Sequence, residues 1–212
     1  MDSRKQAWIW AGLALAGGVG VVVLASSLGG SKAEPPAPGD APAPGTSPET
    51  PPVKREPIVR PGDRVLLLGD SLAVGLSTPL RQLCKGRDAT LTAQAKEGTT
   101  ISAWGSYDPP EQDVCLVSLG TNDMKMLDPL AERPKLDALL ARLKGKSRRV
   151  VWLAPPPMPF PDRGVLAMID DALRGSALAA VPSLDVPRAP DKIHPTAAGY
   201  AAWAGFIWQL IT

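Results

Sequence analysis

The sequence has few histidine and cysteine residues and little net charge. It contains one histidine and two cysteines in 212 residues, and these do not form a cluster with the spacing of a metal site. The net charge is +2, which is too small to create a strong attraction to nucleic acid. No internal repeat is present. We therefore expect neither a zinc-type site nor a nucleic-acid partner.

Charge is absent altogether from the stretch between Ala7 and Leu28. As a helix, these 22 residues would span about 33 Å, which matches the hydrocarbon core of a bilayer. Residues 1–6 before it are basic, and the positive-inside rule places Arg4 and Lys5 in the cytoplasm and the rest of the chain outside. We predict a transmembrane signal-anchor helix over residues 7–28. A cleaved signal peptide is the alternative, and it would export the same chain.

Large apolar residues are almost absent between residues 29 and 57. This segment is rich in proline, alanine and glycine, and it cannot bury enough apolar surface to form a core. Its prolines favour the extended polyproline II conformation. We predict a disordered linker that acts as a semi-rigid spacer between membrane and domain. Plain disorder without a spacing role is the alternative.

Residues 58–212 have a normal length for one domain. Strand-like apolar runs alternate here with helical patterns, which predicts a mostly parallel sheet with helices on both faces. Strands are predicted over 63–68, 90–95, 114–119, 150–154 and 178–181. Helices are predicted over 78–85, 134–144 and 162–174, and from Pro195 towards the C-terminus. The dipeptide Thr78-Pro79 favours the start of the first helix, and Gly145 favours the end of the second.

The motif Gly69-Asp70-Ser71-Leu72 ends the first buried strand. A serine at the carboxyl end of such a strand lies where open α/β sheets place their active sites. A strand-to-helix turn can hold the hydroxyl out at the sheet edge, where it can act as a nucleophile. Ser71 is therefore the candidate nucleophile. The alternative is a structural role, because a serine in a turn is usually a turn former.

A serine alcohol is a weak nucleophile until a base takes its proton, and the usual base is histidine. The chain has one histidine, His194, in the segment Asp191-Lys192-Ile193-His194-Pro195. Asp191 stands three residues earlier, close enough within a turn to hold one imidazole nitrogen and fix the tautomer. If the chain is a serine hydrolase, His194 is its base. The alternative for a single histidine at a helix start is one hydrogen bond to the backbone.

Acyl transfer also needs hydrogen-bond donors for the developing oxyanion. Gly98 follows the second predicted strand, and glycine lets a backbone N–H approach a ligand closely. Asn122 follows the third strand and offers an amide donor. Each of them alone is more typical of a turn residue. Asp70 and Asp123 are predicted to stabilise their turns by hydrogen bonds rather than to take part in the chemistry.

In their order along the domain, these motifs resemble those of the SGNH/GDSL hydrolase family. The resemblance implies a flavodoxin-like three-layer α/β/α sandwich with a mostly parallel five-stranded sheet, and no cofactor or metal. It implies Ser71 as the nucleophile, His194 as general base and then acid, and Asp191 as its orienting partner. The backbone N–H groups of Ser71 and Gly98 and the side chain of Asn122 would form the oxyanion hole. Family members cleave esters or thioesters, and some transfer acetyl groups.

The resulting functional prediction is an extracytoplasmic serine esterase, anchored in the membrane by residues 7–28. It would remove acetyl or other short acyl groups from a cell-envelope carbohydrate. The expected location and the habit of the family suggest the carbohydrate, whereas no particular residue does. A lysophospholipase or thioesterase is the alternative enzyme. From a different class, a non-catalytic carbohydrate-binding relic of the hydrolase fold is also an alternative.

The preferred acyl length depends on apolar wall area, because each buried CH₂ contributes ~0.8 kcal/mol. The loops expected to line the site are short: 98–106, 122–128 and 155–161. Met124, Met158 and Phe160 could form a small apolar pocket within them, but no segment is long enough to cover a long acyl tail. We therefore predict a shallow site that prefers acetyl to long-chain esters.

The two cysteines, Cys84 and Cys115, leave their pairing open. Export would place them in a compartment that permits disulfides. The first helix, which carries Cys84, should run back towards the start of the strand that carries Cys115, so a bond is conceivable. Two separate buried thiols are the alternative, because cysteine is often simply buried.

Overall fold

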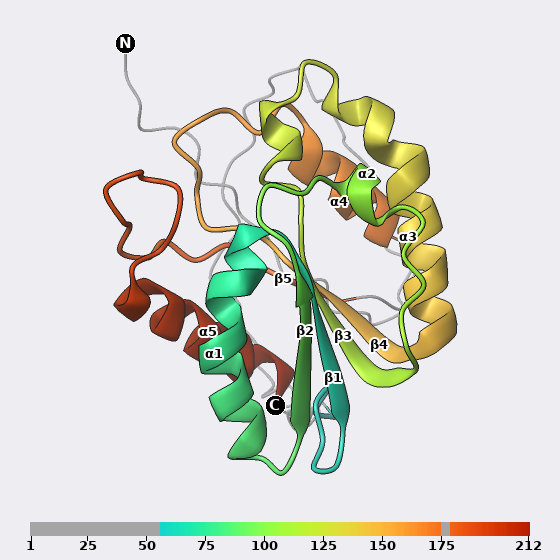
Figure 1. Ribbon diagram of the computed structural model, residues 1–212, viewed down its shortest axis with the longest axis vertical. Helices are drawn as coiled ribbons and strands as arrows, with labels where there is room; N and C mark the ends of the chain where they lie inside the picture. Colours follow the sequence, from blue (N-terminus) through green and yellow to red (C-terminus); the bar gives the residue numbers. More distant parts are fainter. Residues whose placement is uncertain (1–55, 175–178) are drawn as a thin grey trace, which may run out of the picture. The chain divides into compact units, whose positions relative to one another are not determined.

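A five-stranded, all-parallel sheet runs through the part of the chain that the computed structural model describes, residues 56–174 and 179–212 (Figure 1). Its strands are β1 (Arg64–Gly69), β2 (Thr90–Ala95), β3 (Gln112–Ser118), β4 (Ser147–Leu153) and β5 (Ala179–Val181). Their order across the sheet is β2-β1-β3-β4-β5, which is the doubly wound, flavodoxin-like order. The predicted fold class is confirmed.

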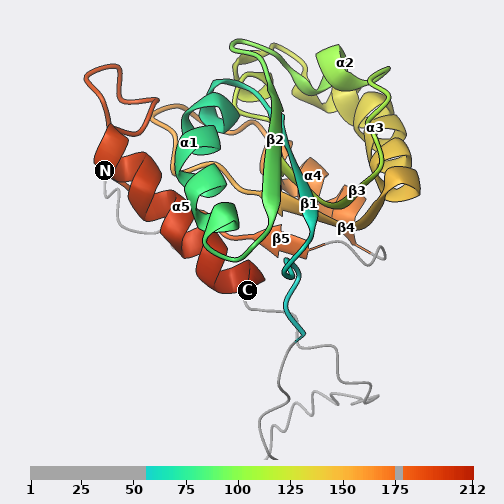
Figure 2. The same cartoon turned by 60° about the horizontal axis from the view of Figure 1, so that its bottom comes forward.

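Helices cover both faces of the sheet, as the two views in Figure 1 and Figure 2 show. One face carries α1 (Ser71–Lys85) and α5 (Ala197–Ile211). The other face carries α2 (Ile101–Trp104), α3 (Arg133–Lys146) and α4 (Val165–Leu173). Two short 3₁₀ helices, η1 (Asp123–Lys125) and η2 (Pro129–Glu132), join β3 to α3.

The central strands β1 and β3 are buried on both faces, which explains their nearly continuous apolar sequences, whereas the edge strand β2 alternates between buried and exposed residues. Successive side chains of a strand point to opposite faces of the sheet. In β1, Val65 and Leu67 pack towards α1 and α5. Leu66 and Leu68 pack towards α3 and α4. The two helical layers therefore rest on two separate apolar cores.

This alternation decides the state of the two cysteines. Cys115 on β3 belongs to the core under α3 and α4, whereas Cys84 on α1 belongs to the core on the other face. The sheet lies between them, and both are buried free thiols, so the alternative without a disulfide is confirmed. Burial raises the pKa of the Cys84 thiol to about 11 and raises the pKa of Cys115 further. Neither thiol is therefore a nucleophile near neutral pH.

The predicted start of the first helix at Thr78-Pro79 is wrong. α1 begins at Ser71 with Asp70 as its N-cap, and Pro79 lies inside the helix. An internal proline costs a helix ~3 kcal/mol. Here α1 buries five side chains against the sheet, at roughly 1.5–3 kcal/mol for each large one, and this burial outweighs the proline. These side chains are Leu72, Ala73, Leu76, Leu80 and Cys84.

The predicted stop at Gly145 is also wrong, because α3 continues through it to Lys146. The helix ends where β4 begins at Ser147, so the strand and not the glycine terminates it. The last helix begins at Ala197, two residues after Pro195, and Thr196 caps it by accepting the N–H of Gly199 over 3.1 Å.

Three predicted segments lie outside the described residues. They are the basic residues 1–6, the membrane span 7–28 and almost all of the linker 29–57. Among the helices of residues 56–174 and 179–212, none combines the length and the apolar character that crossing a bilayer requires. The predictions for the N-terminal segments therefore stay predictions.

Candidate active site

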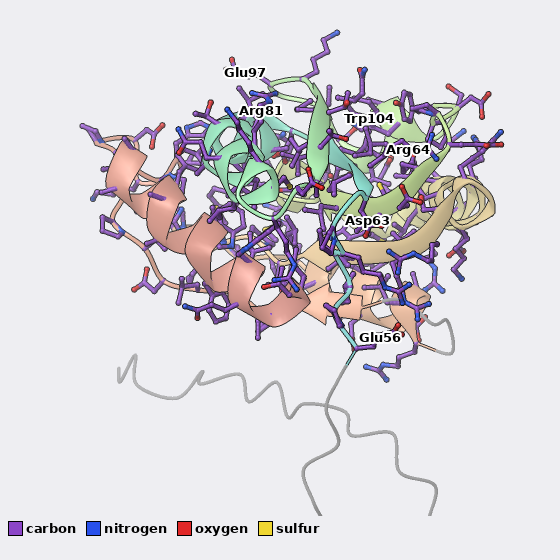
Figure 3. All side chains as sticks on the ribbon, turned by 90° about the horizontal axis from the view of Figure 1, so that it is seen from below. Glu56, Asp63, Arg64, Arg81, Glu97 and Trp104 are labelled. Atoms are coloured by element: carbon purple, nitrogen blue, oxygen red, sulfur yellow. The ribbon has the colours of Figure 1, made fainter. Side chains whose placement is uncertain are left out.

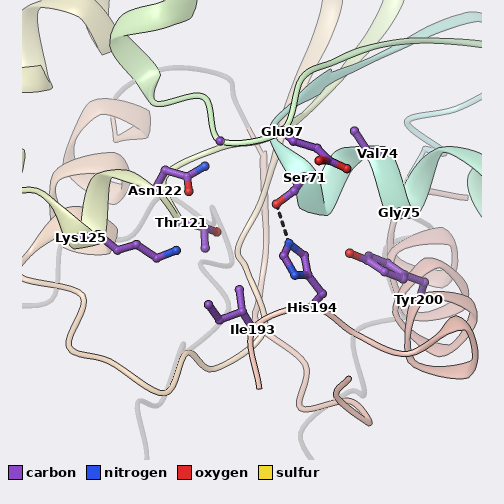
Figure 4. A pocket seen from close by; sticks show the side chains of 11 residues that line it. Ser71, Val74, Gly75, Glu97, Thr121, Asn122, Lys125, Ile193, His194 and Tyr200 are labelled. Atoms are coloured by element: carbon purple, nitrogen blue, oxygen red, sulfur yellow. Dashed lines mark hydrogen bonds between the residues drawn. The ribbon is translucent and has the colours of Figure 1, made fainter. Parts of the chain in front are cut away.

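The predicted site residues come together at the carboxyl edge of the sheet. Ser71 follows β1, Gly98 follows β2 and Asn122 follows β3, while His194 precedes α5. β1 and β3 are neighbours whose following helices cover opposite faces, and open α/β sheets bind ligands at such a point. These four residues line one cavity of about 640 Å³ (Figure 4). Its other lining residues are Val74, Gly75, Glu97, Thr121, Lys125, Ile193 and Tyr200.

Ser71 is positioned by a turn that requires glycine before it. A Cβ on Gly69 would lie 2.2 Å from the carbonyl oxygen of Ser118 on β3, so the two backbones could not approach as they do. The N–H of Asp70 donates to that same carbonyl over 3.1 Å. The Asp70 carboxylate then accepts the N–H of Leu72 over 2.9 Å and caps α1. Ser71 is thus the first residue of α1, at the positive end of the helix dipole.

His194 links Ser71 to Asp191. Its Nε2 lies 2.8 Å from Ser71 Oγ (dashed in Figure 4), and its Nδ1 lies 2.6 Å from Asp191 Oδ2. The other Asp191 oxygen accepts the N–H groups of Ile193 and His194, each over 2.9 Å. These bonds, above all the one from the imidazole, lower the pKa of Asp191 to about 2. An ionised carboxylate at Nδ1 keeps the proton there and leaves Nε2 able to accept the serine proton.

The loop that carries His194 is fixed by contacts on both sides. The N–H of Ala189 donates to the carbonyl of His194 over 2.8 Å. The guanidinium of Arg188 donates to the carbonyl of Ile193 and, over 2.6 Å, to the carbonyl of Pro157 in the loop after β4. The position of the imidazole is therefore set by the backbone around it.

Gly98 and Asn122 lie in neighbouring loops beside Ser71. Gly98 has a φ of +71°, a conformation that favours glycine, and an added Cβ would meet nothing within 4 Å. The backbone conformation, not lack of space, therefore requires glycine here. The Nδ2 of Asn122 donates to the carbonyl of Thr99 over 2.9 Å. Because an amide nitrogen carries two N–H groups, a second one is left for a ligand.

Two buried aspartates support these loops, as predicted. The Asp123 carboxylate accepts the N–H of Ile101 through both oxygens, over 3.1 and 3.2 Å, and so joins the loop after β3 to α2. Asp70 caps α1 with one oxygen, while the other has no partner among the described residues. Burial raises the pKa of Asp70 to about 7 and that of Asp123 to about 6.

The apolar pocket predicted from Met124, Met158 and Phe160 is wrong, because none of the three lines the cavity. Met124 is buried in the core under α3 and α4, and Met158 packs against both cores. The ring of Phe160 lies beneath the ammonium of Lys125, 5.3 Å from its centroid. The loop 155–161 therefore supports Lys125, a residue of the cavity wall, but does not itself line the cavity.

Several cavity residues were not predicted from the sequence. Glu97 and Lys125 place one charge of each sign in the cavity (Figure 4), and neither has an ion-pair partner within the described part of the chain. Their nearness to Gly98 and Asn122 in the sequence could have pointed to them. No feature of the sequence indicated that Tyr200 on α5 would line the cavity. This side chain packs against α1 at Gly75, where a Cβ would lie 2.0 Å from the tyrosine ring.

Comparison with protein families gives one match. A sequence profile described as the GDSL-like Lipase/Acylhydrolase family matches residues 67–202, a range that contains all five predicted site residues. No curated protein matches the sequence.

Several solved structures share the fold. An α/β-hydrolase enzyme from the metagenome of Lake Arreo in Spain is 17% identical with a TM-score of 0.56, covering 73% of this chain and 97% of that one. An acetylxylan esterase from Geobacillus stearothermophilus, crystallised as a catalytic mutant, is 14% identical with a TM-score of 0.55, covering 72% and 95%. A psychrotrophic esterase from Pseudoalteromonas sp. is 16% identical with a TM-score of 0.53, covering 69% and 94%. At these identities the likeness concerns the fold.

Proposed function

Because the chain belongs to the GDSL-like lipase/acylhydrolase family of ester-hydrolysing serine hydrolases, we propose that Ser71, His194 and Asp191 are its catalytic triad. One observation carries this proposal. Nε2 of His194 lies 2.8 Å from the Ser71 hydroxyl, and Nδ1 of the same ring lies 2.6 Å from the Asp191 carboxylate. A base at hydrogen-bond distance from a serine, oriented by a carboxylate, is the arrangement that activates an alcohol.

In the proposed reaction, Ser71 Oγ attacks the ester carbonyl while Nε2 of His194 takes its proton. The oxyanion accepts the N–H groups of Ser71 and Gly98 and the second amide N–H of Asn122. His194 then gives the proton to the leaving alcohol, and the acyl group stays on Ser71. A water deprotonated by His194 releases the acid. Asp191, with its pKa near 2, remains ionised and stabilises the imidazolium throughout.

The proposed substrate is an ester of acetate or another short acid on a cell-envelope carbohydrate, with the enzyme exported and anchored through residues 7–28. The cavity supports short acyl groups, because Glu97 and Lys125 interrupt its wall. A long alkyl chain lying against these charges would remove them from water without giving them a partner. One structural neighbour is an acetylxylan esterase, which supports a carbohydrate-borne acetyl group.

The acyl preference is tested by comparing kcat/KM for p-nitrophenyl acetate and for the dodecanoate below its micelle concentration. We expect the acetate to be the better substrate and Ser71→Ala to be inactive on both. A dodecanoate preference of tenfold or more, equal to about 1.4 kcal/mol of transition-state binding, would contradict the short-acyl proposal and favour a lysophospholipase.

A further inference from the structure

Thr99 belongs to the loop of Gly98 and contacts the loop of Asn122, the two loops that contribute to the proposed oxyanion hole. It follows Gly98 directly, and its hydroxyl donates to the carbonyl of Lys96 over 2.7 Å, which closes the turn that contains Gly98. Its own carbonyl accepts the Nδ2 of Asn122 over 2.9 Å. A single residue therefore touches both the backbone donor and the side-chain donor of the oxyanion hole.

Trp104 anchors Thr99 from outside the cavity. Its indole Nε1 donates to the Thr99 hydroxyl oxygen over 3.0 Å. The indole is half-buried, and it packs edge-on against the ring of Tyr107 with centroids 5.3 Å apart (Trp104 is labelled in Figure 3). The start of α2 is fixed as well, because the buried Asp123 carboxylate holds the N–H of Ile101. Trp104 thus joins Thr99 to a packed part of the domain.

We propose that Thr99 and Trp104 are positioning residues that hold the oxyanion hole in its reactive geometry. Neither lines the cavity, so each acts through the Gly98 N–H and the Asn122 amide. Donors to an oxyanion are effective because they are oriented before the reaction, so a small displacement lowers the rate of the chemical step. The inference rests on the proposed hydrolysis at Ser71.

The hydroxyl of Thr99 can be tested separately from its carbonyl. The single hydroxyl proton goes to the carbonyl of Lys96, and the hydroxyl oxygen accepts the indole N–H of Trp104, so the hydroxyl makes one bond to each side. Valine has the shape of threonine but loses both bonds, whereas serine keeps both. The neighbouring Thr100 offers a matched control, because its side chain makes no capping bond to α2.

The experiment measures kcat and KM for p-nitrophenyl acetate in the full-length wild type and in Thr99→Val, Thr99→Ser, Trp104→Phe and Thr100→Val. We expect Thr99→Val to lower kcat about tenfold with KM within about twofold, because only transition-state stabilisation is lost. Trp104→Phe should lower kcat several-fold. Thr99→Ser and Thr100→Val should remain close to the wild type. The double variant of Thr99→Val and Trp104→Phe should be no slower than Thr99→Val alone, since both remove one link.

Thermal unfolding of each variant identifies losses of activity that come from partial unfolding. The values of kcat are compared at a temperature where all variants are folded. The inference is contradicted if Thr99→Val keeps the wild-type kcat, if Thr99→Ser is as slow as Thr99→Val, or if only KM changes. Wild-type protein that does not hydrolyse the ester at all would contradict the proposed function itself. An active wild type with an equally active Thr99→Val would contradict this inference alone.

Discussion

Asp70 is fully buried next to the proposed nucleophile, and ionisation of its carboxyl group destabilises the folded state. Burial is the main cause that raises its pKa to about 7, and the nearby Asp123 raises it further, while the Leu72 N–H and His194 lower it. In the unfolded chain an aspartate has a pKa of about 3.9. Between these values the folded state binds a proton that the unfolded state does not. Stability therefore falls as the pH rises from about 4 to about 7.

Asp70→Asn should remove most of this pH dependence, because an amide oxygen can still accept the Leu72 N–H but carries no charge. A shift of about three units corresponds to at most about 4 kcal/mol. Urea unfolding at pH 4.5 and pH 8 measures the difference in each protein. We expect a smaller loss of unfolding free energy in the variant, in which the buried Asp123 still contributes in the same direction. Equal losses of unfolding free energy in the wild type and in Asp70→Asn would contradict the assignment of this pH dependence to Asp70.

Asn122→Ala should lower kcat by roughly 10²–10³-fold, the usual cost of one oxyanion donor. The reason is the position of its amide, which is held by the Thr99 carbonyl and lines the cavity beside Ser71. Steady-state kinetics with p-nitrophenyl acetate measure the effect. An unchanged kcat with a raised KM would instead make Asn122 a residue that binds the substrate in its ground state.

The residues of the proposed triad and oxyanion hole could be predicted from the sequence because each lies in a short motif just after a strand or before a helix. Ser71 follows the first apolar run closely, and Asp191 and His194 are only three residues apart. Thr99 and Trp104 could not be predicted. Their hydrogen bonds depend on the path of the loop through space, and a threonine or tryptophan in a loop has no pattern of its own.

At the scale of elements, α1 and α5 approach each other at Gly75. A Cβ there would lie 2.0 Å from the ring of Tyr200, the α5 residue beside His194 in Figure 4. The contact therefore joins the helix of the nucleophile to the helix that follows the base. Close packing of this kind tolerates no added atom without a shift of the tyrosine ring or of one helix.

Gly75→Ala should destabilise the protein by about 1–3 kcal/mol, the usual cost of overpacking. Gly145→Ala is a matched control in α3, where a Cβ would meet nothing within 4 Å. That variant should be stabilised by about 0.5–1 kcal/mol, because alanine favours a helix more than glycine does. Urea unfolding midpoints measure both. Stabilisation of both variants to the same extent would contradict the proposed contact.

The alternation of strands and helices along the chain could be predicted because both faces of the sheet are covered, so β1, β3 and β4 each contain an apolar run. The ends of the elements were harder to predict. Pro79 and Gly145 are local signals, and tertiary packing outweighs them: α1 is held against the sheet on both sides of Pro79, and α3 continues to the start of β4. The face of the sheet towards which Cys115 points depends on the alternation of side chains along β3, and the face on which Cys84 lies depends on where α1 packs.

At the scale of the whole molecule, all residues of the proposed site lie between Ser71 and His194. The N-terminal end of the domain is joined to α5, because the N–H groups of Ile58 and Val59 both donate to the carbonyl of Ile211 over 2.9 Å. A chain that begins at Glu56 keeps these bonds. All residues of the proposed site are therefore present in a chain that begins at Glu56.

A truncated protein that begins at Glu56 should therefore be soluble and have the kcat/KM of the full-length protein. Full-length protein should sediment with membranes, because of the uncharged span from Ala7 to Leu28. Fractionation and esterase assays on both proteins measure this. Mature protein with a new N-terminus after Ala25 or Ala33 would show a cleaved signal peptide, and full-length protein in the soluble fraction would contradict the anchor.

Activation of Ser71 by His194 is tested most directly by labelling with a fluorophosphonate, which reacts with activated serines, followed by mass-spectrometric mapping of the modified residue. The truncated wild type should carry the label on Ser71. Labelling should be lost in Ser71→Ala, reduced at least a hundredfold in rate in His194→Ala, and unchanged in Ser106→Ala, an exposed serine outside the cavity. Label on a different serine, labelling of His194→Ala at the wild-type rate, or no labelling of folded wild-type protein would contradict the account.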